Sequence, residues 1–169
     1  MNAVACFAPI ERSDAKVLIL GSMPGAASLQ QQQYYAHPRN SFWYIMSELL
    51  DVQAWESYAQ KQAALIARHI ALWDVLNSCI RPGSLDASIE EASIVVNDFA
   101  HFFNMHENIT HVFFNGQKAR KEYKTRVLPQ LSASFDHLNY HVLPSTSPAM
   151  ASLSKEQKLD RWRLLVKHI

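Results

Sequence analysis

Four short apolar runs constrain the fold of this chain more than any other feature. They cover residues 17–20, 71–75, 111–114 and 140–143, and they are mostly continuous rather than alternating. Continuous apolar strands are typical of a sheet that is covered on both faces. Because helical patterns separate the runs, the strands are expected to pair in parallel through right-handed crossovers. The sequence therefore predicts an α/β fold, a three-layer α/β/α sandwich around a four-stranded parallel sheet.

The helical segments between these runs are predicted from the spacing of apolar residues. One apolar stripe predicts a helix near residues 42–50, and residues 54–69 fit a second helix. A third stripe begins at Phe99, where Asn97 is well placed to be the N-cap. The sequence Ser-Lys-Glu-Gln at 154–157 has the spacing of a capping box and predicts a helix after the last strand.

Composition bounds the class of protein. A chain of 169 residues with 49% hydrophobic content fits a single domain over residues 1–169. Cys6 and Cys79 form no CxxC pair and are too few for a four-cysteine iron–sulfur cluster, so we expect reduced thiols in a cytoplasmic protein without a cofactor. No apolar run approaches about 18 residues, and no basic region precedes the first apolar residues, so we expect neither membrane insertion nor export.

Polar loops follow all four predicted strands. Their sequences are Gly-Ser-Met-Pro-Gly at 21–25, Leu-Asn-Ser-Cys at 76–79, Asn-Gly at 115–116 and Pro-Ser-Thr-Ser-Pro at 144–148. In parallel sheets of this kind, ligands bind beyond the carboxyl ends of the strands. We therefore expect the functional site at this edge of the sheet.

The segment 33–43 adds aromatic, basic and amide side chains just before the first long helix. Read structurally, Asn40 or Ser41 is a helix N-cap and the aromatic residues belong to the core. Read functionally, the aromatic rings offer a face on which an unstacked base can lie, and Arg39 offers contacts to phosphate. The residues alone leave both readings open.

The loop 21–25 and the segment 33–43 together resemble the hypoxanthine-DNA glycosylase branch of the uracil-DNA glycosylase superfamily. The resemblance continues in the same order through residues 71–76, 83–86, 97–99, 113–116 and 143–149, and it covers roughly residues 15–165. It implies a monofunctional, metal-free and monomeric enzyme that hydrolyses the N-glycosidic bond of hypoxanthine in DNA containing deaminated bases. A uracil-directed or broad-specificity glycosylase and a non-catalytic module that binds damaged DNA stay open as alternatives.

The resemblance also implies a pocket for the extruded base, formed by Gly21, Ser22, Met23, Pro24, Gly25, Tyr35, His37, Phe42 and Asn115. Better-known branches carry an acidic or amide residue at the position of Met23, where it orients the attacking water, and a methionine cannot do this. Asn115 stands where the superfamily has a base-reading asparagine. Its amide offers one donor and one acceptor, which match O6 and N1–H of hypoxanthine. The competing interpretation of Asn115 and Gly116 is a tight hairpin turn.

Asn40 is the residue that we expect to take over the hydrolytic role. A carboxamide has no useful basicity near neutral pH, so Asn40 would orient water and stabilise a cationic sugar through its dipole. His37 can titrate near pH 7 and could support it. A role for Asn40 as a helix cap alone remains the alternative.

DNA contacts are expected from Arg39, Ser145, Thr146, Ser147, Pro148, Met150 and Lys118. The resemblance implies that residues 145–148 form the loop with which this superfamily grips phosphates; an ordinary strand-to-helix turn is the alternative. Met150 stands where an asparagine is expected, and it is interpreted either as an apolar wedge or as loop packing. The formal net charge of only +1 argues against binding through bulk electrostatics, and the basic residues around Lys118 can equally form a solvated helix face.

Overall fold

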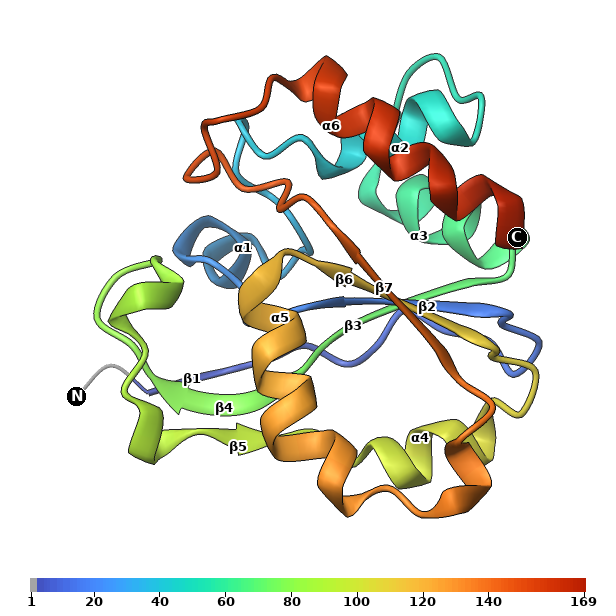
Figure 1. The fold of residues 1–169 in the computed structure, drawn as a ribbon. Helices are drawn as coiled ribbons and strands as arrows, with labels where there is room; N and C mark the ends of the chain where they lie inside the picture. Colours follow the sequence, from blue (N-terminus) through green and yellow to red (C-terminus); the bar gives the residue numbers. More distant parts are fainter. Residues whose placement is uncertain (1–2) are drawn as a thin grey trace.

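The computed structural model describes residues 3–169, and its centre is a four-stranded parallel sheet. The strands are β2 (Val17–Gly21), β3 (Ile70–Asp74), β6 (His111–Asn115) and β7 (Asn139–Leu143), in the order β3-β2-β6-β7. All neighbouring pairs are parallel (Figure 1). The predicted strands and their parallel pairing are therefore confirmed, with ends that differ by one residue.

The pairing register of the strands places their carboxyl ends at one edge of the sheet. Gly21 at the end of β2 pairs with Asp74 at the end of β3, and Asn115 at the end of β6 pairs with Leu143 at the end of β7. All five residues of the central strand β2 are buried, as expected for a strand that is covered on both faces. The loops that leave these strands consequently start side by side.

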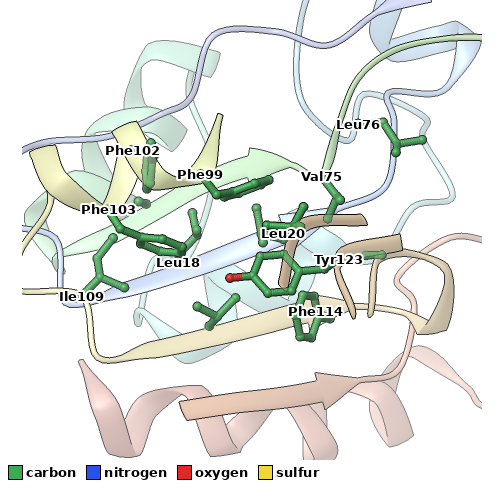
Figure 2. Close-up of a cluster of buried hydrophobic side chains, with 14 of the residues drawn as sticks. Leu18, Leu20, Val75, Leu76, Phe99, Phe102, Phe103, Ile109, Phe114 and Tyr123 are labelled. Atoms are coloured by element: carbon green, nitrogen blue, oxygen red, sulfur yellow. The ribbon is translucent and has the colours of Figure 1, made fainter. Parts of the chain in front are cut away.

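Helices cover both faces of the sheet and complete the three-layer sandwich (Figure 1). They are α1 (Ala26–Gln31), α2 (Phe42–Leu49), α3 (Tyr58–Ala67), α4 (Phe99–Met105), α5 (Gln117–Glu122) and α6 (Lys155–Trp162). Helices α2, α3 and α6 pack on one face, and α4 and α5 pack on the other. Figure 2 shows the hydrophobic core between the sheet and α4, in which Phe99 and Phe103 of α4 lie against Leu18 and Leu20 of β2.

Shorter helical turns connect these elements. The 3-10 turns span Asp86–Ser88, Glu91–Ser93, Leu128–Gln130, Ala133–Phe135 and Arg163–His168, and a π-helical turn spans Tyr123–Val127. Within residues 3–169, every helix is too short or too polar to traverse a bilayer. Cys6 and Cys79 are both free thiols, as the sequence predicted.

A second, antiparallel sheet was not predicted. It consists of β1 (Ala3–Ala5), β4 (Leu76–Ile80) and β5 (Val95–Val96), in the order β1-β4-β5. Residues 76–79 were expected to be a loop at the site, and this expectation is wrong because they form most of β4. Only Val75 separates β4 from β3, so the chain passes from one sheet into the other without a loop.

The helix termini correct one prediction and confirm another. The N-cap of α4 is Asp98, whose side chain accepts a hydrogen bond from the backbone N–H of His101, and not Asn97. Asn97 is buried, and its side-chain amide donates instead to the backbone carbonyl of Asp74 at 2.7 Å. The predicted capping box of α6 is present, with reciprocal bonds between Ser154 and Gln157.

Candidate active site

A cavity of about 790 Å³ opens at the carboxyl edge of the parallel sheet. Most of the residues that were predicted from the sequence to form the site line it: Gly21, Ser22, Met23, Pro24, Gly25, Tyr35, His37, Arg39, Asn40, Asn115, Ser145, Thr146, Ser147, Pro148 and Met150. They come from the loops after β2, β6 and β7 and from the segment before α2. The volume of the cavity lies within the range of small-molecule sites and is large enough for a purine nucleoside.

Thr146 fixes the side-chain amide of Asn115 in one orientation. The backbone N–H of Thr146 donates to Oδ1 of Asn115 at 2.9 Å, and Nδ2 of Asn115 donates to Oγ1 of Thr146 at 2.9 Å. A backbone N–H can only donate, so the atom that faces it must be the amide oxygen. Each end of the amide keeps one further hydrogen-bonding position, an acceptor on the oxygen and a donor on the nitrogen.

The same Thr146 also holds the segment that precedes α2. Its backbone carbonyl accepts a hydrogen bond from the backbone N–H of Ser41 at 3.0 Å, and its side chain is fully buried. Thr146 is therefore hydrogen-bonded both to Asn115, the last residue of β6, and to Ser41, which follows Asn40. A group bound at Asn115 and a group bound at Asn40 are held in a fixed relation through this one residue.

Asn40 directly precedes Ser41, which is the N-cap residue of α2 and makes no side-chain capping bond. Its Oδ1 accepts a hydrogen bond from the backbone N–H of Phe42 at 2.9 Å, which satisfies a donor at the start of α2. The residue also lines the cavity and is only partly buried. The bond to Phe42 fixes which end of the amide is the oxygen, so the NH2 group and the second lone pair of Oδ1 have defined positions.

The wall of the cavity between β2 and β3 contains two buried polar atoms without a partner. Among residues 3–169, neither the hydroxyl of Tyr35 nor Oδ2 of Asp74 makes a hydrogen bond. Both residues line the cavity. A buried polar atom without a partner is costly, and such atoms in a cavity are places where a ligand or a water supplies the missing bond.

Gly21 is required by the close approach of these two groups. A Cβ atom at position 21 would lie 2.6 Å from Oδ1 of Asp74 and 2.8 Å from the hydroxyl of Tyr35, and both distances are too short for a carbon atom. The glycine in this loop thus makes room for a carboxyl group and a phenol at the cavity wall.

Two carboxyl groups at the cavity were not predicted. The pKa of Asp74 is raised to about 7, mainly by burial and also by nearby Asp86, while Arg81 acts in the opposite direction. Burial also raises the pKa of Asp86, against a hydrogen bond from the hydroxyl of Ser22, whose Oγ lies 2.9 Å from one carboxylate oxygen. A signal was present in the sequence for both: Asp74 sits at the carboxyl end of an apolar run, and Asp86 ends the motif 83–86.

Arg81 is a buried residue that ties two walls of the cavity together. One guanidinium nitrogen, Nη2, donates to the carbonyl of Pro24 at 2.5 Å, and Nε donates to the carbonyl of Gly83 at 2.9 Å. Its exposed fraction is 1%. A buried charge needs hydrogen bonds, and two of the three guanidinium nitrogens bond the backbone of these two loops, whereas Nη1 has no partner among residues 3–169.

The structure places two of the predicted site residues outside the cavity. Phe42 is fully buried, and its ring stacks on that of Tyr35 with 4.2 Å between centroids, so it supports Tyr35 from the core. Nζ of Lys118 lies 2.8 Å from the carboxylates of both Glu91 and Glu122. Glu122 is buried, and Lys118 serves to neutralise it.

Comparison with known proteins agrees with this geometry. The family model of the uracil DNA glycosylase superfamily matches residues 9–166. The chain belongs to this superfamily. It is 33% identical over 165 residues to a protein of Methanosarcina acetivorans named hypoxanthine DNA glycosylase, a match that covers 96% of this chain and 97% of that protein. A protein of the same name from Methanosarcina barkeri is 36% identical over 115 residues, which are 67% of this chain and 71% of the relative.

A solved structure is similar over nearly the whole chain. It is the solution NMR structure of a Methanosarcina acetivorans protein provisionally described as a uracil DNA glycosylase. The TM-score is 0.77 at 30% sequence identity, and the alignment covers 98% of both chains. The three-layer fold is therefore that of the superfamily.

Met23 is part of the cavity wall in this member of the superfamily. Its side chain lines the cavity and is 7% exposed, and it packs into the hydrophobic core that contains α4. A thioether neither abstracts a proton nor fixes a water strongly. The polar groups at the cavity therefore belong to other residues, among them His37, Asn40 and Asn115.

Proposed function

We propose that this chain is a monofunctional DNA glycosylase that removes hypoxanthine from DNA and leaves an abasic site. Membership of the superfamily and the names of the two Methanosarcina relatives support the reaction class. The observation that carries the choice of base is the side-chain amide of Asn115, which Thr146 fixes in one orientation in the cavity.

Asn115 distinguishes hypoxanthine from adenine through this fixed orientation. The remaining donor of its amide pairs with O6 of hypoxanthine, and the remaining acceptor pairs with N1–H. Adenine presents the opposite pattern and would require the amide to turn over, which would set its NH2 group against the backbone N–H of Thr146. An unsatisfied buried group costs about 1–3 kcal/mol, so this contact alone discriminates about 5- to 150-fold.

Cleavage of the glycosidic bond places positive charge on the sugar and negative charge on the departing base. The donor of Asn115 stabilises the base, because its position is fixed before the charge develops. Asn40 lies in the same cavity and orients the attacking water through its NH2 group and the second lone pair of Oδ1. Its dipole also favours a cationic sugar, without any proton being abstracted by the amide.

The loop after β7 is suited to hold the DNA backbone beside the extruded nucleotide. Ser145 and Ser147 provide hydroxyl groups at the cavity, and Nζ of Lys158 donates to the backbone carbonyl of Ser147 at 3.0 Å. Lys158 is 3% exposed, so its charge lies beneath this loop where phosphate is expected. Arg39 and Met150 line the same cavity and complete the proposed contact surface.

Uracil is the main competing substrate, because N3–H and O4 present the same donor and acceptor to Asn115. A product assay with hypoxanthine, uracil and xanthine in one duplex sequence tests the proposal. We expect alkali-sensitive strand breaks to form fastest at hypoxanthine. Faster release of uracil would assign the chain to the alternative specificity. Retention of the duplex in a gel shift without breaks at any of the three bases would identify a binding module.

The role of Asn40 needs a variant that keeps the helix start intact. Asn40→Ala removes both the amide and the bond to Phe42, whereas Asn40→Ser removes the amide but keeps a side-chain oxygen that can accept the N–H of Phe42. We expect both variants to lose at least about 100-fold in single-turnover rate while they bind the duplex. Turnover of Asn40→Ser within tenfold of the wild type would show that the residue is a cap and that another group orients the water.

A further inference from the structure

Three histidine side chains meet at the end of the sheet opposite the cavity. His111 is the first residue of β6, His141 lies in β7, and His168 is the last residue of the turn Arg163–His168. One ring nitrogen from each lies within 4.8 Å of the other two. His111 lies four residues before Asn115, which is about 13 Å along β6, whereas His141 pairs with Phe113 in the middle of the sheet.

Packing holds the three rings in place. The rings of His111 and His168 stack with 3.9 Å between centroids, and that of His141 lies 5.2 Å from His111 and 5.4 Å from His168. The fully buried ring of Phe113 lies 4.6 Å from His141 and forms the apolar support beneath the cluster. All three histidines are partly buried.

The spacing of the nitrogens is close to that of a metal site. Nδ1 of His111 and Nε2 of His141 are 2.9 Å apart, a distance at which the two atoms share a single proton. In a tetrahedral zinc site with Zn–N bonds of 2.0–2.1 Å, ligand nitrogens lie about 3.3 Å from one another. The three nitrogens lie within 4.8 Å of one another, so the stacked rings have to rotate about their side-chain bonds to point at a common ion.

We propose that His111, His141 and His168 bind a divalent transition metal ion, Zn²⁺ in the first place. Imidazole nitrogen is a preferred ligand of zinc, and three protein ligands with a water in the fourth position are an established zinc geometry. The three histidines are only partly buried, so water can reach them. This site departs from our expectation of a metal-free chain, and it is independent of the reaction proposed for the cavity.

The ion fastens the segment after α6 to the parallel sheet. His168 belongs to the 3-10 turn that continues α6, whereas the other two ligands belong to β6 and β7. A ligand that binds only the folded arrangement stabilises it by mass action. The site therefore has a structural role, which is measurable without any assay of base excision.

Calorimetric titration of the metal-stripped full chain with Zn²⁺ tests the proposal. We expect one ion per chain, and at least about tenfold weaker binding in each of the variants His111→Gln, His141→Gln and His168→Gln. His137→Gln is the matched control, because His137 is exposed and belongs to the turn before β7. This control should bind Zn²⁺ as the wild type does. Co²⁺ in place of Zn²⁺ should give visible absorption bands that the His168→Gln variant lacks.

Thermal unfolding supplies a second readout for variants that fold less well. A hundredfold excess of Zn²⁺ over its dissociation constant should raise the Tm of the wild type by about 5–10 °C, and it should leave the Tm of His168→Gln unchanged. The proposal is overturned if the wild type binds no zinc. It is also overturned if zinc binding and the rise in Tm persist unchanged in the three ligand variants, because the ion would then lie elsewhere.

Discussion

The buried carboxyl group of Asp74 makes the stability of this protein depend on pH in a direction opposite to that of a salt-bridged aspartate. Its pKa rises from 3.8 to about 7, first because of burial and then because of Asp86. Between these two values, the unfolded chain has released a proton that the folded protein still holds. The free energy of unfolding therefore falls as pH rises, and the loss is complete above about pH 7.

The size of this effect follows from the two pKa values. The difference corresponds to about 4 kcal/mol in full, of which about 2.5 kcal/mol develops between pH 5 and pH 8. Asp74→Asn keeps the shape of the side chain and removes the ionisation. The free energy of unfolding of this variant, minus that of the wild type, should therefore grow by about 2.5 kcal/mol from pH 5 to pH 8.

Urea unfolding followed by tryptophan fluorescence measures this difference, since Trp73 precedes Asp74 in β3. The exposed Asp51 provides the control, because Asp51→Asn should give a stability curve parallel to that of the wild type. If the curves of Asp74→Asn and the wild type are also parallel between pH 5 and pH 8, then Asp74 is ionised throughout this range. Burial would in that case not raise the pKa of this carboxyl group.

Three further substitutions separate the contacts at the cavity from those outside it. Thr146→Val removes the hydroxyl that Asn115 bonds, and it should lower kcat/KM for hypoxanthine about 10- to 100-fold while the amount released from adenine changes little. Gly21→Ala should reduce the single-turnover rate at least about 100-fold, because its Cβ collides with the carboxyl group of Asp74, and circular dichroism should show an intact fold. Lys118→Ala leaves the buried Glu122 without one of its cations, so it should destabilise the protein by about 1–3 kcal/mol, measured by urea unfolding. An unchanged salt dependence of DNA binding in this last variant would indicate that Lys118 contacts no phosphate.

The main sheet could be predicted from the sequence because burial on both faces leaves continuous apolar runs. The strand β4 was missed for the opposite reason. Only Leu76 and Cys79 of Leu76–Ile80 are buried, and the strand follows β3 after a single residue, so its polar residues resembled a loop. The N-cap of α4 was misplaced by one residue, because Asn97 and Asp98 have similar capping propensities and only the buried bond from Asn97 to Asp74 distinguishes them.

The location of the site followed from strand topology, but its internal geometry did not. Asn115 was predicted at the cavity because it ends a parallel strand. The bonds with Thr146 join residues that lie 31 positions apart, and no local pattern specifies such a pair. Asp74 was overlooked because the strand was expected to continue to residue 75, which placed this carboxyl group inside the strand and not at its end. The three histidines of the proposed zinc site are likewise brought together only by the sheet and the turn after α6.

The bonds from buried Arg81 to the carbonyls of Pro24 and Gly83 bear on how the enzyme would recognise a lesion. Two loops that share one guanidinium are ordered when the chain folds, so no conformational entropy is lost from this wall when a base arrives. The pocket then keeps its shape and binds bases that have already left the DNA helix. Under this arrangement, differences in excision rate between opposing bases would report how easily each mispair opens, and the pocket itself would contribute equally to all of them.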